Sequence, residues 1–572
     1  MHLKKVTNKK SGRTYLSIVH SYRDKDTKKS RAKTIESLGY LDELAKTYED
    51  PIAFFEEKAK QMTQQREEQT FDMTFRIRGE ERLEKDGQNR KNFGYAVLSK
   101  LYHELHLHTF LLHRQRHANH DYDANSILKL LVFSRLLEPS SKKKAYENKE
   151  AFFENTSFTL DDVYRCLTFF NQHKETLQLW MHEQITQQYD RDTSLVYYDV
   201  TNYYFEMDRP DDLRKKGVSK EHRPDPIVQM GLFMDTDGVP ITYGLYPGNV
   251  LDKQTLIPEL GRIQRQFSLG RTIVVADKGM TTGDNIWYTL SAKNGYVFSY
   301  SVRGASRAFK EYVLDSKGYR ETTQGFKIKS RLEPREINVT AQNGKKITQR
   351  VDEKHVVFYS EKYAQKAKAD RAPALEKAKN LIQNPSAYNK STASGAGRYV
   401  KNLTFDPKTG EILEDAEQAL LFDEEKLQKE EAFDGYYALI TSEYQEADEQ
   451  IIDIYRGLWK IEESFKVTKS DLETRPVYLS REAHIEAHFL TCFVSLVIAR
   501  LLERRMKGKY AIPAMLDSLK KASCSHIQQN YYLFDHYDEI LSDMGQEFGI
   551  DFGKKCLPLG EIKKMLGKVK KG

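Results

Sequence analysis

The stretch SLVYYDVTNYYFE, residues 194–206, decides the fold. Its apolar and aromatic residues favour a central β-strand, and three further β-rich runs follow it: IVQMGLFMD (227–235), GVPITYGLY (238–246) and TIVVADKGM (272–280). Turn sequences such as DTDG and PGN separate these runs. The region therefore predicts a sheet at the centre of an α/β domain.

Two of these predicted strands end on an aspartate, Asp199 after SLVYY and Asp277 after TIVVA. A carboxylate at the end of a buried strand is costly unless it is paired or binds a metal ion. If both aspartates face the same edge of the sheet, they form a site for a hard cation such as Mg²⁺. These two segments alone leave open the alternative that both aspartates only cap turns.

A third acidic residue, Glu462, lies in YRGLWKIEESFKVTK (455–469), within a helix that we expect over residues 446–470. At about 100° per residue, one narrow stripe of this helix is apolar: Ile451, Ile454, Leu458, Ile461 and Phe465. A neighbouring face carries Tyr455, Glu462, Lys466 and Lys469. The simpler interpretation is a Glu462–Lys466 pair on a solvated face, but it does not explain why Tyr455 and Lys469 share that face. Trp459 adjoins the apolar stripe, which favours a core position over stacking on a DNA base.

Together these segments resemble the three catalytic blocks of DDE transposases. YDVTNYYFE, VVADKGM and the pattern Y-x6-E-x6-K occur in the order of that family. The most similar type is the bacterial insertion-sequence group whose third block is a Tyr–Arg–Glu–Lys signature and whose core is split by a β-rich insertion. Residues 219–249 and 472–488, and the basic start of the chain, also resemble this group. The resemblance implies that Asp199, Asp277 and Glu462 are the catalytic residues and the metal ligands.

The resemblance further implies that Tyr455, Arg456, Lys466 and Lys469 contact DNA phosphates. One position departs from the family pattern. The family's arginine falls on Leu458 here, whereas Arg456 directly follows Tyr455. Arg456 either supplies the same phosphate contact from a shifted position, or the contact is absent.

The function implied is that of a transposase that binds the terminal inverted repeats of its element, cleaves the ends and joins their 3′-hydroxyls to target DNA. Two Mg²⁺ ions roughly 3.5–4 Å apart support this chemistry. We expect Asp199 to bridge both ions, the other two acids to complete one ion each, and Mn²⁺ to substitute for Mg²⁺. The alternatives are a nuclease or recombinase that mobilises no element, and a domesticated, non-catalytic DNA-binding protein. The sequence has no GxxxxGK[ST] loop, so we expect no nucleotide cofactor.

The spacing of the acids predicts the domain organisation. Asp199 and Asp277 are 78 positions apart, room for three strands and a helix of an RNase H-like core, whereas 185 positions separate Asp277 from Glu462. We therefore expect an α/β fold in which an RNase H-like mixed sheet (191–300 and 441–505) is interrupted by a β-rich insertion domain (301–440). A small basic β-hairpin module with a linker (1–90) and a helical DNA-binding domain (91–190) precede the core, and a C-terminal region (506–572) follows it.

The composition indicates which kinds of partner and which cellular compartment to expect. The 572 residues carry a net charge of +7, which permits a nucleic-acid partner without requiring one. The four cysteines are scattered, which argues against disulfides or a zinc finger. The longest apolar run, 489–499, is too short to cross a membrane and is typical of a buried helix. We expect a cytoplasmic, nucleoid-associated protein that acts on double-stranded DNA, as a homodimer and without a membrane.

Two smaller groups of residues complete the expectations. Lys4, Lys5, Lys9, Lys10 and Arg13, in or near a predicted hairpin over 13–41, are expected to recognise the element ends together with the helical domain. His484 and His488 are one helical turn apart, but no third ligand accompanies them, so structural roles are favoured.

Overall fold

The structure is a computed structural model that describes residues 1–571 except 9–11, 24–29, 69–79, 81, 83–86, 88, 117, 119, 208–209, 219, 221–223, 324, 384–398, 404–418, 476 and 528–529. The chain divides into two compact units, Met1–Gly87 and Gln88–Gly572.

The first unit is a three-stranded antiparallel sheet with a helix against it. The strands are β1 (His2–Thr7), β2 (Thr14–Arg23) and β3 (Ser30–Tyr40), and the helices are α1 (Leu41–Leu44) and α2 (Pro51–Glu68). Leu16 and Ile18 of β2 and Phe55 of α2 are buried. The hairpin predicted over 13–41 is confirmed as β2–β3. Of its basic residues, Arg13 is paired with Asp42 and Glu43, whereas Lys9 and Lys10 lie outside the described residues.

A nine-stranded mixed sheet forms the centre of the second unit, in the order β10-β11-β14-β17-β9-β8-β5-β6-β7. β5 (Leu195–Tyr204), β6 (Ile227–Met234) and β7 (Pro240–Pro247) are antiparallel neighbours, whereas β8 (Ile273–Ala276) and β9 (Gly295–Tyr300) run parallel to β5. The helices α9 (Leu256–Gln266) and α10 (Gly283–Ser291) pack against this part of the sheet. β6, β7, α9 and β8 thus fill the interval between Asp199 and Asp277, as the spacing predicts.

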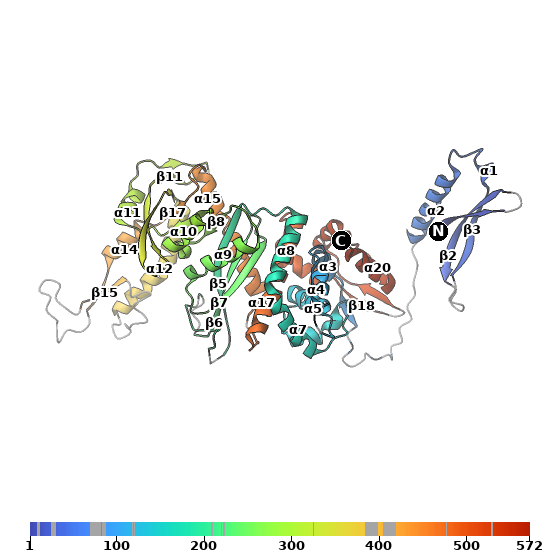
Figure 1. The fold of residues 1–572 in the computed structure, drawn as a ribbon, viewed down its shortest axis with the longest axis horizontal. Helices are drawn as coiled ribbons and strands as arrows, with labels where there is room; N and C mark the ends of the chain where they lie inside the picture. The colour runs from blue at the N-terminus through green and yellow to red at the C-terminus, as the bar shows by residue number, and fades with distance from the viewer. Residues whose placement is uncertain are drawn as a thin grey trace. The chain divides into compact units, whose positions relative to one another are not determined.

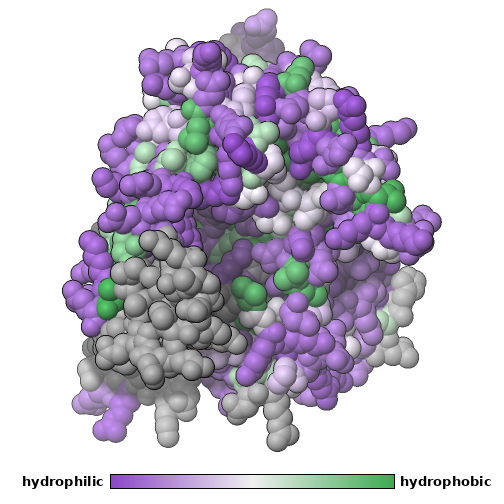
Figure 2. All heavy atoms as spheres, turned by 90° about the vertical axis from the view of Figure 1, so that its left-hand side faces the viewer, coloured by the Kyte–Doolittle hydropathy of each residue, from purple (hydrophilic) through white to green (hydrophobic). Residues whose placement is uncertain are grey.

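The segment between β9 and β17 extends the same sheet. β17 (Tyr436–Thr441), β14 (Lys354–Tyr359), β11 (Lys327–Leu332) and β10 (Arg320–Glu321) continue it with antiparallel pairing. The other elements here are α11 (Arg307–Leu314), β12 (Arg335–Thr340), β13 (Lys346–Val351), α12 (Glu361–Gln383), β15 (Val400–Leu403), β16 (Ala419–Phe422) and α14 (Glu424–Glu431). Figure 2, viewed from this side of Figure 1, shows a largely hydrophilic surface on which apolar side chains stand singly or in small groups.

The opposite side of the unit is helical, and the long helix α17 (Glu482–Arg505) lies between the sheet and the other helices (Figure 1). These are α3 (Tyr95–Glu104), α4 (Leu107–Gln115), α5 (Ala124–Leu137), α6 (Lys142–Glu147), α7 (Leu160–Gln172) and α8 (Lys174–Tyr189). Side-chain caps start three of them: Asp123 on α5, Ser141 on α6 and a capping box of Thr159 and Asp162 on α7. α17 alone among the described helices is long and apolar enough to cross a membrane, but 94% of its apolar window is buried inside the protein. The buried helix predicted over 489–499 is therefore confirmed as the centre of the core.

The C-terminal region completes this helical side. It contains α18 (Ile512–Lys521), β18 (Ser523–His526), β19 (Tyr531–Phe534), α19 (Glu539–Phe548), β20 (Cys556–Pro558) and α20 (Leu559–Val569). β18 pairs with β4 (Arg90–Asn92), and Phe93 packs against Phe534 and Phe552. The two ends of the second unit therefore share one core.

Candidate active site

The first two acids lie side by side on neighbouring parallel strands. Tyr198 of β5 is in register with Ala276 of β8, so Asp199 and Asp277 are the residues that follow this pair. Asp199 is not at a strand end as predicted, because β5 continues to Tyr204 through its pairing with β6. Relative to β8, which ends at Ala276, it still lies at the carboxyl edge of the parallel pair.

Asp199 is half-buried, and most of its surroundings oppose its ionisation. Burial raises the pKa of its carboxyl to about 6, and the negative charges of Asp277 and Asp252 raise it further, while Lys220 lowers it. Lys220 donates from Nζ to the carbonyl oxygen of Val200. Asp252, in the turn η2 (Asp252–Gln254), was not predicted, because its place beside Asp199 depends on how the segment after β7 folds back.

Two hydroxyl groups hold Asp277. Ser299 at the end of β9 donates to Asp277 Oδ1 over 2.8 Å, and Tyr455 donates to the same oxygen over 3.2 Å. Tyr455 was predicted to contact DNA phosphates, and its contact with Asp277 was not predicted. Ser299 was not predicted. Its position near the carboxyl end of a strand parallel to β5 would have indicated the site, but only if the order of the strands in the sheet had been known.

The helix expected over 446–470 is broken into three pieces. α15 (Asp448–Arg456) ends before Gly457, α16 (Trp459–Lys466) follows, and a π-helical turn runs over Val467–Asp471. A glycine is required at this break, because a Cβ at position 457 would come within 2.0 Å of the Tyr197 hydroxyl on β5. The close approach seats the α15–α16 junction directly above the strand that carries Asp199.

The predicted apolar stripe is confirmed on both sides of the break. Ile451, Leu458, Ile461 and Phe465 are buried, and Arg500 of α17 binds α16 through Ser464 and the carbonyl of Lys460. Glu462 and Lys466 are exposed on α16. The π-turn shifts Lys469 over the ring of Tyr203, 5.6 Å from its centroid.

Three residues near the break bear on the predicted core position of Trp459 and on the missing signature arginine. Trp459 is 56% exposed, so the predicted core position is wrong: the break at Gly457 turns it away from the apolar stripe. Arg456 pairs with Asp453 over 3.1 Å and lies 5.0 Å from the ring of Phe326. Leu458, where the family has its arginine, is buried.

Comparison with known protein families decides the identity. Residues 3–72 match the N-terminal domain of IS1634 family transposases, and residues 214–498 match the transposase DDE domain. The chain is a DDE transposase of an insertion sequence. The second match contains Asp277 and Glu462 and begins after Asp199. The transposase is therefore a DNA-acting enzyme of the cut-and-paste type, and its DDE domain implies a requirement for a divalent metal ion.

Solved transposase structures align loosely with the chain. A piggyBac transposase synaptic complex with hairpin DNA aligns at 8% identity and a TM-score of 0.34, over 83% of this chain and 84% of that chain. A Mos1 mariner paired-end complex with Mn aligns at 15% identity and a TM-score of 0.13, over 31% of this chain and 59% of that chain. No curated protein sequence matches the transposase.

The chemistry of the two aspartates fits a divalent cation. Their oxygens are hard ligands, and a cation between them would stabilise the ionised form of Asp199, whose pKa is raised mainly by burial and further by the charge of Asp277. Within the described part of the chain, no three His, Cys, Asp or Glu side chains lie close enough together to hold a metal ion. The register brings the two aspartates to neighbouring positions, and the exposed Glu462 is near enough to raise the pKa of Tyr455, the residue that donates to Asp277.

A cavity of 360 Å³ opens beside Asp277. Lys278 and Arg303 supply positive charge to its lining, and Arg303 is paired with Asp434 over 2.7 Å. Tyrosines dominate the rest of the wall: Tyr300, Tyr363, Tyr436, Tyr437 and Tyr455. A basic and aromatic cavity next to the acids suits the sugar–phosphate chain and bases of a DNA end.

Proposed function

We propose that Asp199, Asp277 and Glu462 are the catalytic residues of this transposase, in an RNase H-like core, and that they hold two Mg²⁺ ions, for which Mn²⁺ can substitute. The observation that carries the proposal is the register of β5 and β8, which supports a shared site for Asp199 and Asp277. Bound divalent ions would neutralise charge at the scissile phosphate and activate the attacking oxygen.

The chain's own residues prepare this centre. Ser299 and Tyr455 both donate to Oδ1 of Asp277, which fixes the carboxylate and directs Oδ2, to which no described residue donates, toward a cation. Glu462 lies on α16, which begins just after the tight junction of Gly457 with Tyr197 of β5. A small movement of α16 on DNA binding brings Glu462 to the aspartate pair.

Basic side chains around the acids bind the DNA end. Lys278 and Arg303 line the cavity beside Asp277, and Lys466 and Lys469 follow Glu462 along the chain. Arg456 acts at the margin of this surface, since Asp453 and Phe326 already engage it. These contacts hold phosphates on both sides of the scissile bond.

The transposase acts on the terminal inverted repeats of its element and on target DNA as a homodimer. Each chain has one set of three acids, and two ends must be cut and joined together, so two chains supply the two sites. The first unit and the helical region 91–190 read the ends, while the core carries out the chemistry.

Asp199→Asn, Asp277→Asn and Glu462→Gln test the assignment. Each should abolish cleavage of an element-end duplex in Mg²⁺ and joining of precut ends, because each removes a ligand charge while keeping side-chain size. End binding, measured by gel shift, should stay within a few-fold of the wild type. Glu463→Gln is the matched control, since Glu463 is the neighbour of Glu462 and pairs with Arg500 instead. Near-normal cleavage by any of the three variants would remove that residue from the centre.

A further inference from the structure

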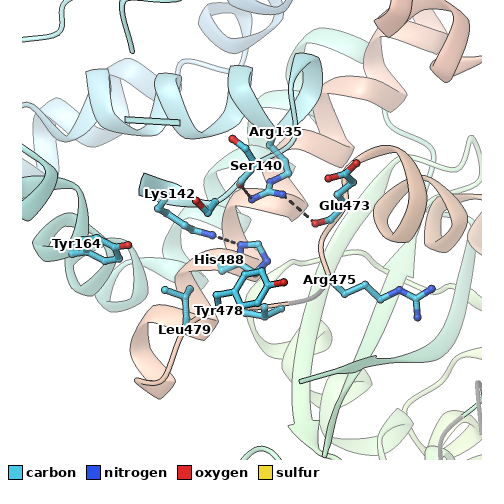
Figure 3. A pocket seen from close by; sticks show the side chains of 11 residues that line it. Arg135, Ser140, Lys142, Tyr164, Glu473, Arg475, Tyr478, Leu479 and His488 are labelled. Carbon is cyan, nitrogen blue, oxygen red and sulfur yellow. Dashed lines mark hydrogen bonds between the residues drawn. The ribbon is translucent and has the colours of Figure 1, made fainter. Parts of the chain in front are cut away.

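A second cavity, of 590 Å³, lies between the helical region and the loop that follows the π-turn. Arg135 of α5 and Lys142 of α6 come from one side, and Glu473, Tyr478 and His488 from the other (Figure 3). Arg135 is 6% exposed and Lys142 is 6% exposed, so both cations lie at the floor. Burying two cations together is costly unless anions or hydrogen bonds compensate them.

Arg135 is only partly compensated. Its guanidinium donates to the carbonyl oxygens of Ser140, Leu472 and Glu473 over 2.9–3.2 Å. Its Nε is buried and has no hydrogen-bond partner among the described residues. Carbonyl oxygens satisfy hydrogen bonds but bring no countercharge, so the positive charge of Arg135 remains.

The positive charge of the Lys142 ammonium is compensated even less than that of Arg135. Its ammonium donates to Nδ1 of His488, and His488 is in turn bonded through Nε2 to the carbonyl of Thr474 over 3.0 Å. Burial, with Arg135 nearby, lowers the pKa of Lys142 to about 7. Among the residues that the structure describes, no carboxylate forms an ion pair with Lys142 or Arg135. Glu473, the acid in the lining, is exposed and is therefore solvated.

One wall of the cavity contacts the strand that carries Asp199. The loop that forms this wall follows the π-turn, which contains Lys469, and Arg475 in that loop lies over the ring of Tyr204, 5.3 Å from its centroid. Tyr203 and Tyr204 are four and five residues beyond Asp199 on β5. At roughly 3.3 Å per residue this is about 13–17 Å, a length that B-DNA covers in about four or five base pairs.

We propose that the cavity floored by Arg135 and Lys142 is a binding site for a backbone phosphate of the DNA end, several base pairs from the cleaved bond. The inference rests on the proposed DNA-cleaving function and adds to it a contact made from the helical region. A phosphate there supplies the missing countercharge and accepts from Lys142 and from the Nε of Arg135. Because a phosphate carries no sequence information, the contact fixes the register of the duplex and does not select its bases.

The test is the salt dependence of DNA binding by the full chain carrying Lys142→Met. Loss of one phosphate contact should lower the slope of log K against log salt by about 0.9 and weaken end and random duplexes to the same extent. Lys143→Met is the matched control: it makes the same substitution at the exposed next position of α6. An unchanged slope in Lys142→Met, or an equal loss in Lys143→Met, would overturn the proposal.

A second variant keeps the test independent of folding defects. Ser140→Asp places a carboxylate at the cavity and leaves both cations intact, so it should weaken DNA binding while the Tm is maintained or raised. Inorganic phosphate distinguishes the two sources of the ligand. If phosphate raises the Tm of the wild type but not of Lys142→Met, while the DNA slope of Lys142→Met is normal, the cavity takes free phosphate and the DNA assignment is wrong.

Failure of this inference and failure of the proposed function give different results. A normal slope in Lys142→Met with cleavage lost in Asp199→Asn overturns the cavity alone. A reduced slope in Lys142→Met with cleavage retained in Asp199→Asn overturns the catalytic assignment instead.

Discussion

At the scale of single residues, the sharpest feature of the active site is the pair of hydroxyls on Asp277. Ser299 and Tyr455 reach the same oxygen from elements far apart in the sequence. Groups that orient a metal ligand typically affect activity by about 10–100-fold. Tyr455→Phe and Ser299→Ala should each reduce cleavage by a factor in that range while leaving end binding intact.

The control for these two variants is Tyr444→Phe. Tyr444 donates over 2.7 Å to the carbonyl of Asp352, away from the acids. It should cleave like the wild type in the same time course. Full activity in Tyr455→Phe would mean that the contact with Asp277 has no part in the reaction.

Lys142 gives a prediction about stability and pH. Its folded pKa of about 7 is below the ordinary value of 10.5. Between these pH values the unfolded chain binds the proton and the folded chain does not, so the free energy of unfolding rises with pH, by up to about 1.4 kcal/mol per pH unit. Lys142→Met should abolish this part of the slope between pH 7 and 9 and be more stable than the wild type at pH 7.

Denaturant unfolding at several pH values measures that slope, and the difference between variant and wild type removes the contribution of other groups. The exposed Lys143→Met serves again as the control and should keep the wild-type slope. A parallel pH dependence in Lys142→Met and wild type would show that Lys142 keeps its proton in the folded chain.

Residue types and order were enough to predict that Asp199 and Asp277 share one edge of the sheet, because an acid after an apolar strand is costly to bury unless it is paired or binds a metal ion. The contact of Tyr455 with Asp277 was not predicted, since the sequence suggested a DNA phosphate as the partner of Tyr455. Ser299, Asp252 and Lys220 were not predictable. A serine on a strand and an acid in a turn are common, and only the strand order and the fold of the turn bring them to the site.

At the scale of elements, the seat of α15 and α16 on β5 is decided by one glycine. Gly457→Ala places a Cβ about where the Tyr197 hydroxyl lies, 2.0 Å away in the present backbone. The junction must move, at a cost of about 1–3 kcal/mol, and α16 with Glu462 must move too. We expect a lower Tm and a cleavage defect that exceeds the defect in DNA binding.

Tyr197→Val removes the obstructing ring, so it should make Gly457→Ala less harmful. The double variant then shows a coupling free energy of opposite sign to the single effects. Strict additivity of the two substitutions would mean that the Cβ is accommodated without moving α16.

The same element shows where periodicity fails. A regular helix through residues 446–470 places Lys469 beside Glu462, and the apolar stripe fits it. The break at Gly457 and the π-turn depend on Tyr197 and on the packing of α17, which no local pattern contains. The apolar stripe was predictable because each turn of helix buries its own apolar residue. The rotation of one helical segment relative to the next was not predictable, because it depends on the break and on the π-turn.

At the scale of the whole molecule, strand existence was predictable and strand partnership was not. The runs quoted from 194–280 are strands, but β10, β11 and β14 join the same sheet as β5. The pairing of β4 with β18 links positions more than 400 residues apart. Such contacts leave no periodic signal, since each strand is a few residues long and its partner is elsewhere.

This connectivity determines where the chain can be divided. A fragment that starts near residue 190 loses β4 and α3–α8, and so exposes the faces of α17 and of the C-terminal region that they cover. It should aggregate or fail to fold, and its DNA binding would report nothing about recognition. A fragment that starts at Gln88 keeps the second compact unit whole.

The fragment 88–572 therefore tests the role of the first unit. It should melt within a few degrees of the full chain's main transition, because the first unit, Met1–Gly87, is compact in its own right. It should bind random duplex nearly as well as the full chain does, through the basic groups of the core, but its preference for element ends over random duplex should fall by at least about ten-fold. Competition gel shifts with both duplexes give that ratio directly. If the fragment keeps the full preference for its ends, recognition belongs to the helical side of the second unit, and the first unit has another task.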